Sequence, residues 1–369
     1  MLYNTNKQSL TKSLFFISLF GGMRKKSYLC KRYNILYMKQ IIQYIWMLLL
    51  LPVMIGCSQE EAGSGEGGQV PIEFTTNTSA TFITRSIITN ISDFRSAGFG
   101  VFAYSTGNTP WVTAAASATP NFMYNQQVTY SSRWTYSPVK YWPNDNTPAD
   151  GSGASGSQSK SYISFFAYAP YGGDGIVLSE NTTSNAPVIT YTWGQDHNLL
   201  YATPQLNLYK YDSNGAKDDG RVGDVITFNF HHALALVNFK VRRKADTGMT
   251  VTLKSLSISG FYTSGTFNLG SSSWTSPSGT GGPLSLRDTD LSVTASTEGS
   301  AHEVGSSLLI PGSSLLYSIS YSIGARTYTH TDQSISFSPG PDMGCQYTII
   351  FTIDGENIIV DRTKYTEQW

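Results

Sequence analysis

The sequence predicts an all-β protein, and three observations support this fold class. From Cys57 onward the chain is rich in serine, threonine, glycine and aromatic residues, a composition typical of sheets and turns. Apolar residues recur at alternate positions, which is the period of a strand with one buried face. Clusters of glycine, proline and asparagine separate these segments, as in β-sandwiches, and we find no amphipathic helical pattern.

Residues 38–56 have the pattern of a bacterial lipoprotein signal peptide. Met38 can start translation, a lysine follows it, and residues 41–55 form an almost unbroken apolar run. A glycine and then Cys57 come next, ahead of polar and acidic residues, so we predict that Cys57 is the lipidated first residue of the mature chain. The alternative is an uncleaved membrane anchor, but the 15-residue run is shorter than the ~20 residues that span a bilayer. Residues 1–37 precede a complete signal peptide, and we expect them to reflect a start site assigned too early.

The charge of the predicted mature chain differs from that of the whole sequence. Eight of the 25 lysines and arginines lie in residues 1–56, which contain no acidic residue. The 313 residues from Cys57 onward therefore carry 17 basic and 25 acidic residues, a net charge of −8. This balance argues against nucleic-acid binding, which needs a basic face. The length predicts about two domains.

Cysteine usage excludes two kinds of cross-link in the mature chain. Cys30 lies upstream of the signal peptide and Cys57 is assigned to lipid, so only Cys345 is left in the body of the protein. One thiol can form neither an internal disulfide nor a cysteine zinc site. Because Cys345 precedes an apolar strand, we predict that its thiol is buried.

The mature chain divides into a tether and two predicted domains. Residues 57–69 contain a glycine- and serine-rich flexible tether, residues 70–221 are the N-terminal β-sandwich domain, and residues 222–369 are the C-terminal one. The polar, turn-rich segment 209–221 is the expected linker. Strands are expected at 70–76, 98–104, 225–230, 237–241, 251–258, 317–323 and 347–353. The last of these begins a pair of strands joined by Asp354 and Gly355.

Aromatic residues are densest between residues 121 and 170. Trp134, Tyr136, Tyr141 and Trp142 lie in this stretch and are our candidate ligand-stacking residues. Such side chains either fill the core of a β-sandwich or serve as platforms for sugar rings on its surface. The core is the favoured interpretation, but alternation leaves some of the four facing outward, so both interpretations stay open.

No pattern in the sequence points to a catalytic residue, a metal or a cofactor. His231 and His232 are neighbours, so on a strand they face opposite sides and cannot readily share an ion. The acidic segment at Asp212 lacks the spacing of a calcium loop. The glycine-serine segment 151–156 lacks the strand–turn–helix context of a nucleophile elbow. We therefore expect that the protein is not an enzyme and uses no cofactor.

The order of the motifs resembles a known family. The signal peptide is followed by a strand and a Thr-Arg pair, and then by GFGVFAY, RWTYSPVKYWP, ISFFAYAPY, NLLYA and ITFNFHHALALVNFKV. This order resembles the fimbrillin family, the Mfa-like type V pilins of Gram-negative bacteria, over nearly all of residues 57–369. The resemblance implies two tandem transthyretin-like β-sandwich domains. It also implies a lipidated precursor that is exported to the outer surface of the cell.

The resemblance further implies assembly by β-strand exchange. A trypsin-like processing protease would cut near the first strand, and a strand from another pilus subunit would fill the groove left behind. Arg85 matches the Thr-Arg position and is the expected processing site, with Arg95 as second choice. The C-terminal segment 347–369 is the first candidate for a donated strand. Stalk, tip and anchor subunits differ in this scheme, and the sequence does not decide among them.

We therefore predict a surface-exposed lipoprotein precursor of a type V pilus subunit that supports adhesion. It would reside in the outer membrane and the fimbrium. Its implied partners are other pilus subunits in a homo- or hetero-polymer, the outer membrane through its lipid, and a host or bacterial surface ligand. The alternative is a monomeric surface glycan-binding lipoprotein that keeps its first strand and binds oligosaccharide through exposed tryptophan or tyrosine.

Overall fold

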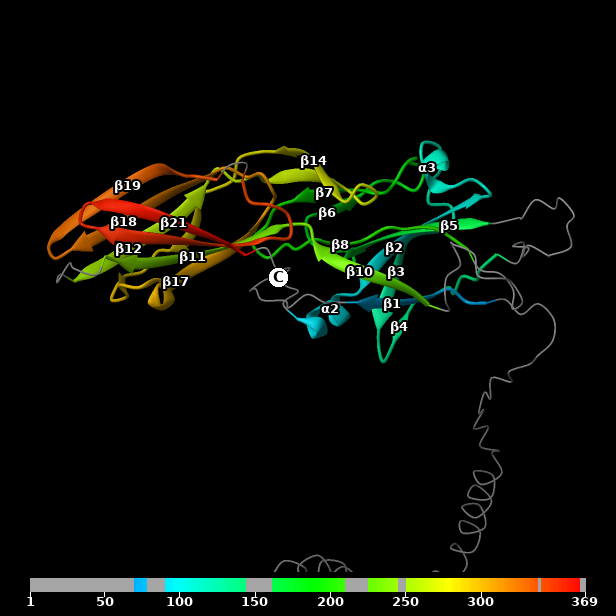
Figure 1. Ribbon diagram of the computed structural model, residues 1–369, viewed down its shortest axis with the longest axis horizontal. Coiled ribbons are helices and arrows are strands. Elements are labelled where there is room, and N and C mark those ends of the chain that lie inside the picture. The colour runs from blue at the N-terminus through cyan, green and yellow to red at the C-terminus, as the bar shows by residue number, and fades with distance from the viewer. Residues whose placement is uncertain are drawn as a thin grey trace, which may run out of the picture. The chain divides into compact units, whose positions relative to one another are not determined.

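The computed structural model describes residues 70–77, 90–143, 161–209, 225–244, 250–337 and 340–365. Within these ranges the chain is built almost wholly from β-strands, which confirms the predicted all-β class (Figure 1). None of the described helices is long and apolar enough to cross a membrane. Two predicted sites, Cys57 and Arg85, lie outside the described residues.

The largest sheet in the described part of the chain has eight strands. Its order is β1-β10-β8-β5-β2-β3-β4, and β9 also pairs with β5. All of these pairs are antiparallel except β1 and β10, which run parallel. The strands span Glu73–Asn77 (β1), Phe99–Gly107 (β2), Met123–Tyr130 (β3), Trp134–Thr135 (β4), Tyr162–Ala169 (β5), Leu200–Ala202 (β8), Gln205–Leu208 (β9) and Val225–His232 (β10).

A second sheet joins strands from the two halves of the sequence. Its order is β14-β13-β7-β6, so β13 from the second half pairs directly with β7 from the first. Its buried residues Ile189 and Phe267 share one apolar cluster with Phe102 and Phe166 of the eight-stranded sheet. The strands span Ile176–Leu178 (β6), Val188–Thr192 (β7), Ser264–Asn268 (β13) and Ser273–Ser278 (β14).

Two further sheets enclose the core of the C-terminal half. One has the order β17-β11-β20-β21, and the other has the order β15-β12-β18-β19, with β16 also paired to β12. Buried residues of both sheets belong to one apolar cluster. The strands span Ala235–Arg243 (β11), Val251–Ser259 (β12), Leu284–Arg287 (β15), Leu291–Ser292 (β16), His302–Leu309 (β17), Leu315–Ile323 (β18), Arg326–Ile335 (β19), Gln346–Asp354 (β20) and Asn357–Tyr365 (β21).

The described helical segments are short. They span Ile91–Ala97 (α2), Trp111–Ala114 (α3) and Glu298–Ser300 (η1, a single 3-10 turn). Asn90 caps the N-terminus of helix α2, and its side-chain oxygen accepts hydrogen bonds from the N–H groups of Ser92 and Asp93 at 2.8 and 3.0 Å. It ends at Gly98, whose φ of +64° is costly for any other residue.

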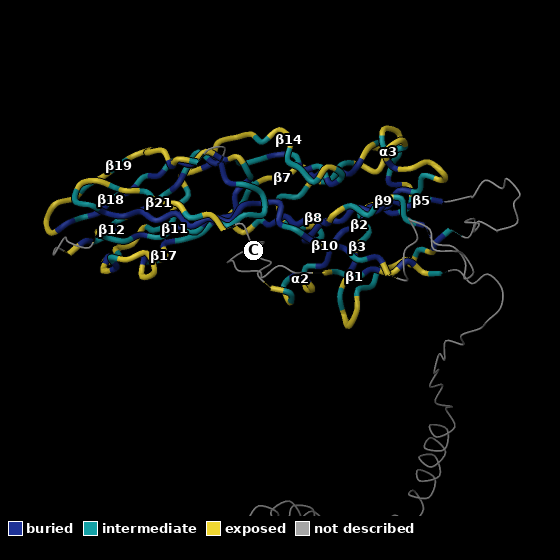
Figure 2. The backbone as a smooth tube through the Cα atoms, viewed as in Figure 1, coloured by how far each residue is buried: buried dark blue, intermediate teal, exposed yellow. Residues whose placement is uncertain are grey.

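Alternation along the strands determines which side chains form the core. In β18, every second residue from Leu315 to Ile323 is buried, as the period-two pattern predicts. β5 differs because seven of its eight residues are buried, which indicates a strand covered on both faces. Figure 2 shows the same contrast, with buried segments inside the sheets and exposed segments at loops and edge strands.

Sheet membership changes between β10 and β11. β10 belongs to the eight-stranded sheet with β1, whereas β11 belongs to the C-terminal sandwich. The predicted domain boundary between residues 221 and 222 stays a prediction, because it concerns independent folding units. β10 follows this boundary in the sequence, yet it pairs with strands β1 and β8, which precede it. Cys345 is half-buried in the turn before β20, so the prediction of a buried thiol is wrong.

Candidate functional site at the first strand

β1 is the first described strand and ends the order of the eight-stranded sheet (Figure 1). Five residue pairs connect it to β10. The segment just before β1 is held from the other side by two backbone hydrogen bonds. The N–H of Ile72 donates to the carbonyl of Lys140 at 2.8 Å, and the N–H of Trp142 donates to the carbonyl of Val70 at 2.9 Å. The first strand is therefore held by β10 along residues 73–77, and the residues that lead into it are held by the segment 140–142.

The side chains that point inward from this segment are buried. Ile72 is 1% exposed and Phe74 is 5% exposed, whereas Glu73 between them faces solvent. The ring of Phe74 lies 5.2 to 6.5 Å from four other aromatic rings, in stacked, tilted and edge arrangements; these rings belong to Phe99, Tyr136, Phe165 and Phe228. Burial of such a ring is a large stabilising contribution, and the aromatic geometry adds to it.

Two aromatic side chains also hold β1 through hydrogen bonds. The hydroxyl of Tyr136 donates to the carbonyl oxygen of Ile72 at 2.8 Å. The indole Nε1 of Trp134 donates to the hydroxyl of Thr76 at 3.2 Å. Burial raises the pKa of Tyr136, so its hydroxyl keeps its proton and stays a donor. We name Phe99, Trp134, Tyr136, Phe165 and Phe228 together the β1 seat.

Helix α2 closes one end of the β1 seat. Its Phe94 is fully buried, and its ring lies 5.5 Å from that of Trp134, 6.4 Å from that of Phe99 and 5.0 Å from that of Phe230. The next residue, Arg95, is exposed on the last turn of the helix, with its guanidinium 4.3 Å from the centre of the Tyr130 ring. The second-choice processing site thus lies inside a capped helix that carries a core residue.

The four candidate ligand-stacking residues occupy different environments. Trp134 and Tyr136 are half-buried against β1. Trp142 is 3% exposed, and its ring lies 6.0 Å from that of Phe165 in the core. Tyr141 is 43% exposed. The structure therefore brings three of the four together around the first strand and leaves Tyr141 at the surface.

The two neighbouring histidines face opposite sides of β10, as the alternation predicts. His232 is 4% exposed, and burial lowers the pKa of its ring to about 3. His231 is half-buried, and its Nε2 lies 3.0 Å from the hydroxyl oxygen of Thr203. Among the described residues, no group of three or more histidine, cysteine or acidic side chains is placed to hold a metal ion.

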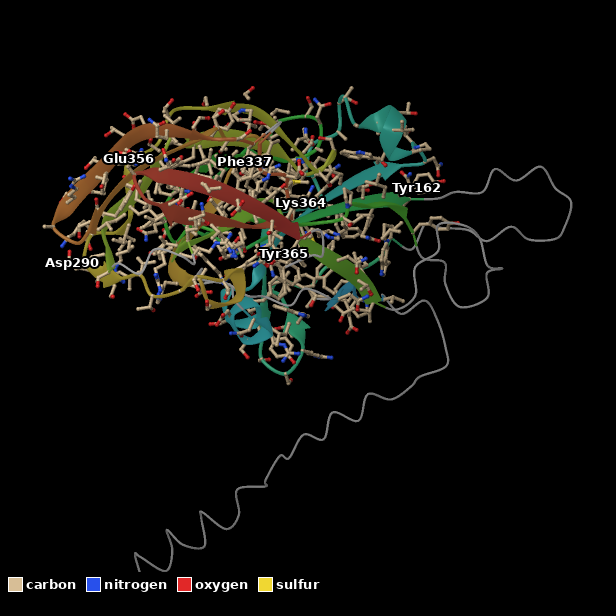
Figure 3. All side chains as sticks on the ribbon, turned by 60° about the vertical axis from the view of Figure 1, so that its left-hand side comes forward. Tyr162, Asp290, Phe337, Glu356, Lys364 and Tyr365 are labelled. Carbon is tan, nitrogen blue, oxygen red and sulfur yellow. The ribbon has the colours of Figure 1, made fainter. Side chains whose placement is uncertain are left out.

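The C-terminal hairpin is the second feature that bears on assembly. β20 and β21 pair over nine residues around a turn that contains Gly355, whose φ is +62°. Figure 3 shows Glu356 at this turn and Lys364 near the other end of β21. β20 is buried, but β21 is an edge strand whose outer ion pairs join Arg242 to Asp361 at 3.0 Å and Lys364 to Asp342 at 2.5 Å.

Sequence reasoning missed the partners of the first strand. Alternation predicts that Ile72 and Phe74 face a core, but it does not indicate that β10, about 150 residues later, is the neighbour. The role of Tyr136 also escaped prediction, because its hydroxyl finds a backbone acceptor 64 positions away. The density of aromatic residues in segment 134–142 was the one sequence feature that indicated a binding site here. It did not indicate that the first strand of the same chain fills this site.

Comparisons with known proteins point to one group of proteins. A family model described as fimbrillin-like matches residues 157–369, more than half of the chain. Fimbrium subunit Fim1C of Phocaeicola vulgatus is 28% identical over 223 residues, which are 56% of this chain and 53% of that protein. The chain thus spans about half the length of this curated relative.

A solved structure shares the fold. A fimbrial protein from Bacteroides vulgatus ATCC 8482 superposes with a TM-score of 0.62 at 22% sequence identity, and the match covers 80% of this chain and 98% of that one. The likeness extends over nearly the whole of that protein, so the sheets described above belong to an architecture already seen in a fimbrial protein.

Proposed function

This chain belongs to the fimbrillin-like family, and on that premise we propose that it is the surface lipoprotein precursor of a fimbrial subunit. In this proposal the subunit joins a type V pilus by strand exchange after a trypsin-like protease has cut it, and the assembled fimbrium supports adhesion. The observation that carries the proposal is the β1 seat. A single short edge strand fills an aromatic slot there, and in the sequence this strand follows the predicted signal peptide and tether.

The proposed exchange has a simple physical basis. In the intact chain, β1 is covalently attached, so its effective concentration at the seat is high. A cut between β1 and α2 removes that advantage and leaves the non-covalent contacts to hold the strand: the five-residue ladder, the hydrogen bonds to the segment 134–142 and the buried side chains. Loss of β1 would expose the edge of β10 and an apolar groove, which an extended strand from another chain would satisfy by β-strand addition.

Arg85 remains the proposed cleavage site, and the place of Arg95 in α2 favours this choice. Proteolysis occurs preferentially in exposed irregular segments rather than in hydrogen-bonded helices. A cut after Arg95 would also detach Phe94, which is fully buried against Trp134 and Phe99. A cut after Arg85 would release β1 and keep α2 in place at the end of the groove.

The remaining parts of the proposal concern anchoring and donation. Cys57 would carry the lipid that holds the precursor in the outer membrane until processing. The exposed edge strand β21 is the candidate donor to a neighbouring subunit. Because a donor site and an acceptor site are different surfaces, such contacts are heterologous and generate a filament when they do not close into a ring.

The aromatic cluster supports assembly more than glycan binding. Trp134 and Tyr136 donate hydrogen bonds to the β1 segment, and Trp142 is buried in the core beside it. Side chains that hold a strand are not available as a flat platform for a sugar. Of the four candidate stacking residues, Tyr141 alone is exposed, and one tyrosine makes a weak case for an oligosaccharide site.

Limited proteolysis combined with peptide exchange tests the proposal. The purified chain, starting at Cys57, is treated with a low dose of trypsin, and the new N-terminus is read by mass spectrometry. A labelled peptide with the sequence of residues 70–77 is then added. We expect cleavage after Arg85 and replacement of the resident strand by the peptide. The Arg85→Ala variant should remain closed and bind no peptide, and a cut chain that never exchanges its strand would contradict the proposal.

A further inference from the structure

We propose that the β1 seat selects an incoming strand by its side-chain pattern, and that β21 of a second copy of this chain does not supply this pattern. The matching strand presents an aliphatic, an aromatic and a hydroxyl side chain at alternate positions. This inference rests on the strand exchange proposed above and specifies the chemistry of the incoming strand. It follows from three alternate positions: Ile72 and Phe74 are buried in the apolar cluster, and the half-buried Thr76 accepts the hydrogen bond from Trp134.

The first inward position takes a branched aliphatic side chain. Ile72 is 1% exposed and belongs to the apolar cluster of the eight-stranded sheet. Its own carbonyl accepts the hydrogen bond from Tyr136, which fixes the backbone at this position. A charged side chain here would lose its hydration without gaining a partner, and that loss is expensive.

The second inward position requires an aromatic ring. Phe74 lies against four rings of the β1 seat, and its centroid is 5.5 Å from that of Phe228 in a stacked arrangement. A smaller aliphatic side chain at this position would leave a void among these rings, because a packed core relaxes only partly around a missing group.

The third inward position requires a hydrogen-bond acceptor. The indole of Trp134 can only donate a hydrogen bond, and its Nε1 is directed at the Thr76 hydroxyl at 3.2 Å. The indole itself is fixed by three neighbouring rings, those of Phe94, Phe99 and Tyr130 at 5.5, 4.8 and 5.1 Å. A lysine or arginine at the third position offers no acceptor, so the indole would lose its hydrogen-bond partner in the strand.

β21 does not meet these three requirements in any parallel register. With Ile358 at the first position, Val360 underfills the aromatic position and Arg362 faces Trp134. With Ile359 first, Thr363 supplies a hydroxyl, but Asp361 enters the aromatic position.

Tyr365 is the one aromatic residue of β21, and other arrangements fail as well. With Val360 at the first position, Arg362 and Lys364 both enter the seat. In the reversed direction, Thr363 and Tyr365 supply a hydroxyl and a ring, but Glu367 then takes the aliphatic position.

The neighbouring strand β20 offers a better pattern but is not free to leave. Ile349 and Phe351 would suit the first two positions, with Ile353 in place of the hydroxyl. All three are fully buried in the core of the C-terminal sandwich, between β11 and β21. Its release would dissolve that core, so the C-terminal hairpin of this chain contains no strand that both fits and can move.

Competition between peptides on the trypsin-treated chain tests this inference. Four peptides are compared by fluorescence anisotropy. They are the sequence of residues 70–77, the same sequence with Phe74→Ala, the same with Thr76→Val, and the sequence of residues 356–365 from β21. We expect the first peptide to bind tightest. The Thr76→Val peptide should bind about fivefold more weakly, as loss of one neutral hydrogen bond implies. The Phe74→Ala and β21 peptides should bind at least tenfold more weakly.

The outcomes separate this inference from the proposed function. If the β21 peptide binds as tightly as the peptide of residues 70–77, strand exchange stands and the selection argued here is wrong. If no peptide binds the cut chain, strand exchange itself fails. A Trp134→Phe variant adds a second check, because the advantage of Thr76 over valine should disappear when the indole donor is removed.

Discussion

The hydroxyl of Tyr136 donates a hydrogen bond to the carbonyl oxygen of Ile72 at 2.8 Å and joins two segments 64 positions apart. The same hydroxyl accepts a hydrogen bond from the N–H of Lys140 at 3.2 Å. One side chain thus links the start of the first strand to the segment around Lys140. Substitution of Tyr136 is therefore a sensitive test of how strongly β1 is held in the fold.

The Tyr136→Phe variant should be less stable by about 1–2 kcal/mol, because a half-buried carbonyl and N–H lose a shared partner while the ring is kept. Chemical denaturation measures this difference. Tyr141→Phe is the matched control, since Tyr141 is 43% exposed and should change stability little. Equal effects of the two changes would show that the hydrogen bond to Ile72 contributes nothing measurable.

Phe74→Ala should destabilise the intact chain by about 3–5 kcal/mol, the range for removing a buried aromatic ring. The expected cause is a cavity among the rings of the β1 seat. Glu73→Ala is the control on the adjacent position. Its ion pair with Arg133 is 4.0 Å long and solvent-exposed, so its loss should cost less than about 1 kcal/mol. A small effect at Phe74 would mean that β1 contributes little to the precursor.

His232 should make the fold sensitive to acid. Its pKa is about 3 in the folded chain, and the ordinary histidine value is 6.5, so the unfolded state binds a proton first as the pH falls. The associated stability is fully present above about pH 6.5 and is lost progressively between pH 6.5 and pH 3. The total loss is on the order of 5 kcal/mol.

Denaturation curves between pH 7 and pH 4.5 for the natural chain and for His232→Gln measure this effect. The variant should show a flatter dependence over this interval, and parallel curves would rule out His232 as the source. The hydrogen bond from Lys364 lowers the carboxyl pKa of Asp342, so Asp342 also makes both proteins less stable in acid. Because this effect is the same in the natural chain and in the variant, it cancels when the two curves are compared.

A fragment of residues 222–369 should not fold cooperatively by itself. In the whole chain β13 pairs with β7 over five residues, and Phe267 and Leu269 are fully buried in the cluster shared by both halves. Without β7, this apolar surface would be exposed. Near-ultraviolet circular dichroism and thermal unfolding of the fragment provide the measurement. A sharp unfolding transition would instead show that the two predicted domains are independent folding units.

Much of the fold could be predicted from the sequence because local patterns specify local structure. The alternation in 317–323 identifies β18 and its buried face, and Asp354 with Gly355 marks the turn between β20 and β21. The adjacent histidines were correctly assigned to opposite faces of one strand. These inferences need only the period of a strand and the chemistry of a turn.

The β1 seat is harder to predict from the sequence, because several of its contacts join residues far apart in the chain. Trp134 and Tyr136 were singled out from aromatic density, but the structure assigns their polar atoms to Thr76 and Ile72. Phe94 was not identified at all, because a seven-residue helix leaves almost no periodic signal.

The sequence by itself determined the all-β class, the face that most strands bury and the resemblance to fimbrial proteins. Only the tertiary structure decided that β1 runs parallel to β10, that β7 pairs with β13 across the two halves, and that α2 closes the β1 seat. The physical reason is that alternation with a period of two residues shows which face of a strand is apolar. It does not show which other strand becomes its neighbour in the sheet. The neighbour is selected by the packing of the whole core, where Phe74, Phe99 and Phe228 meet from distant parts of the chain.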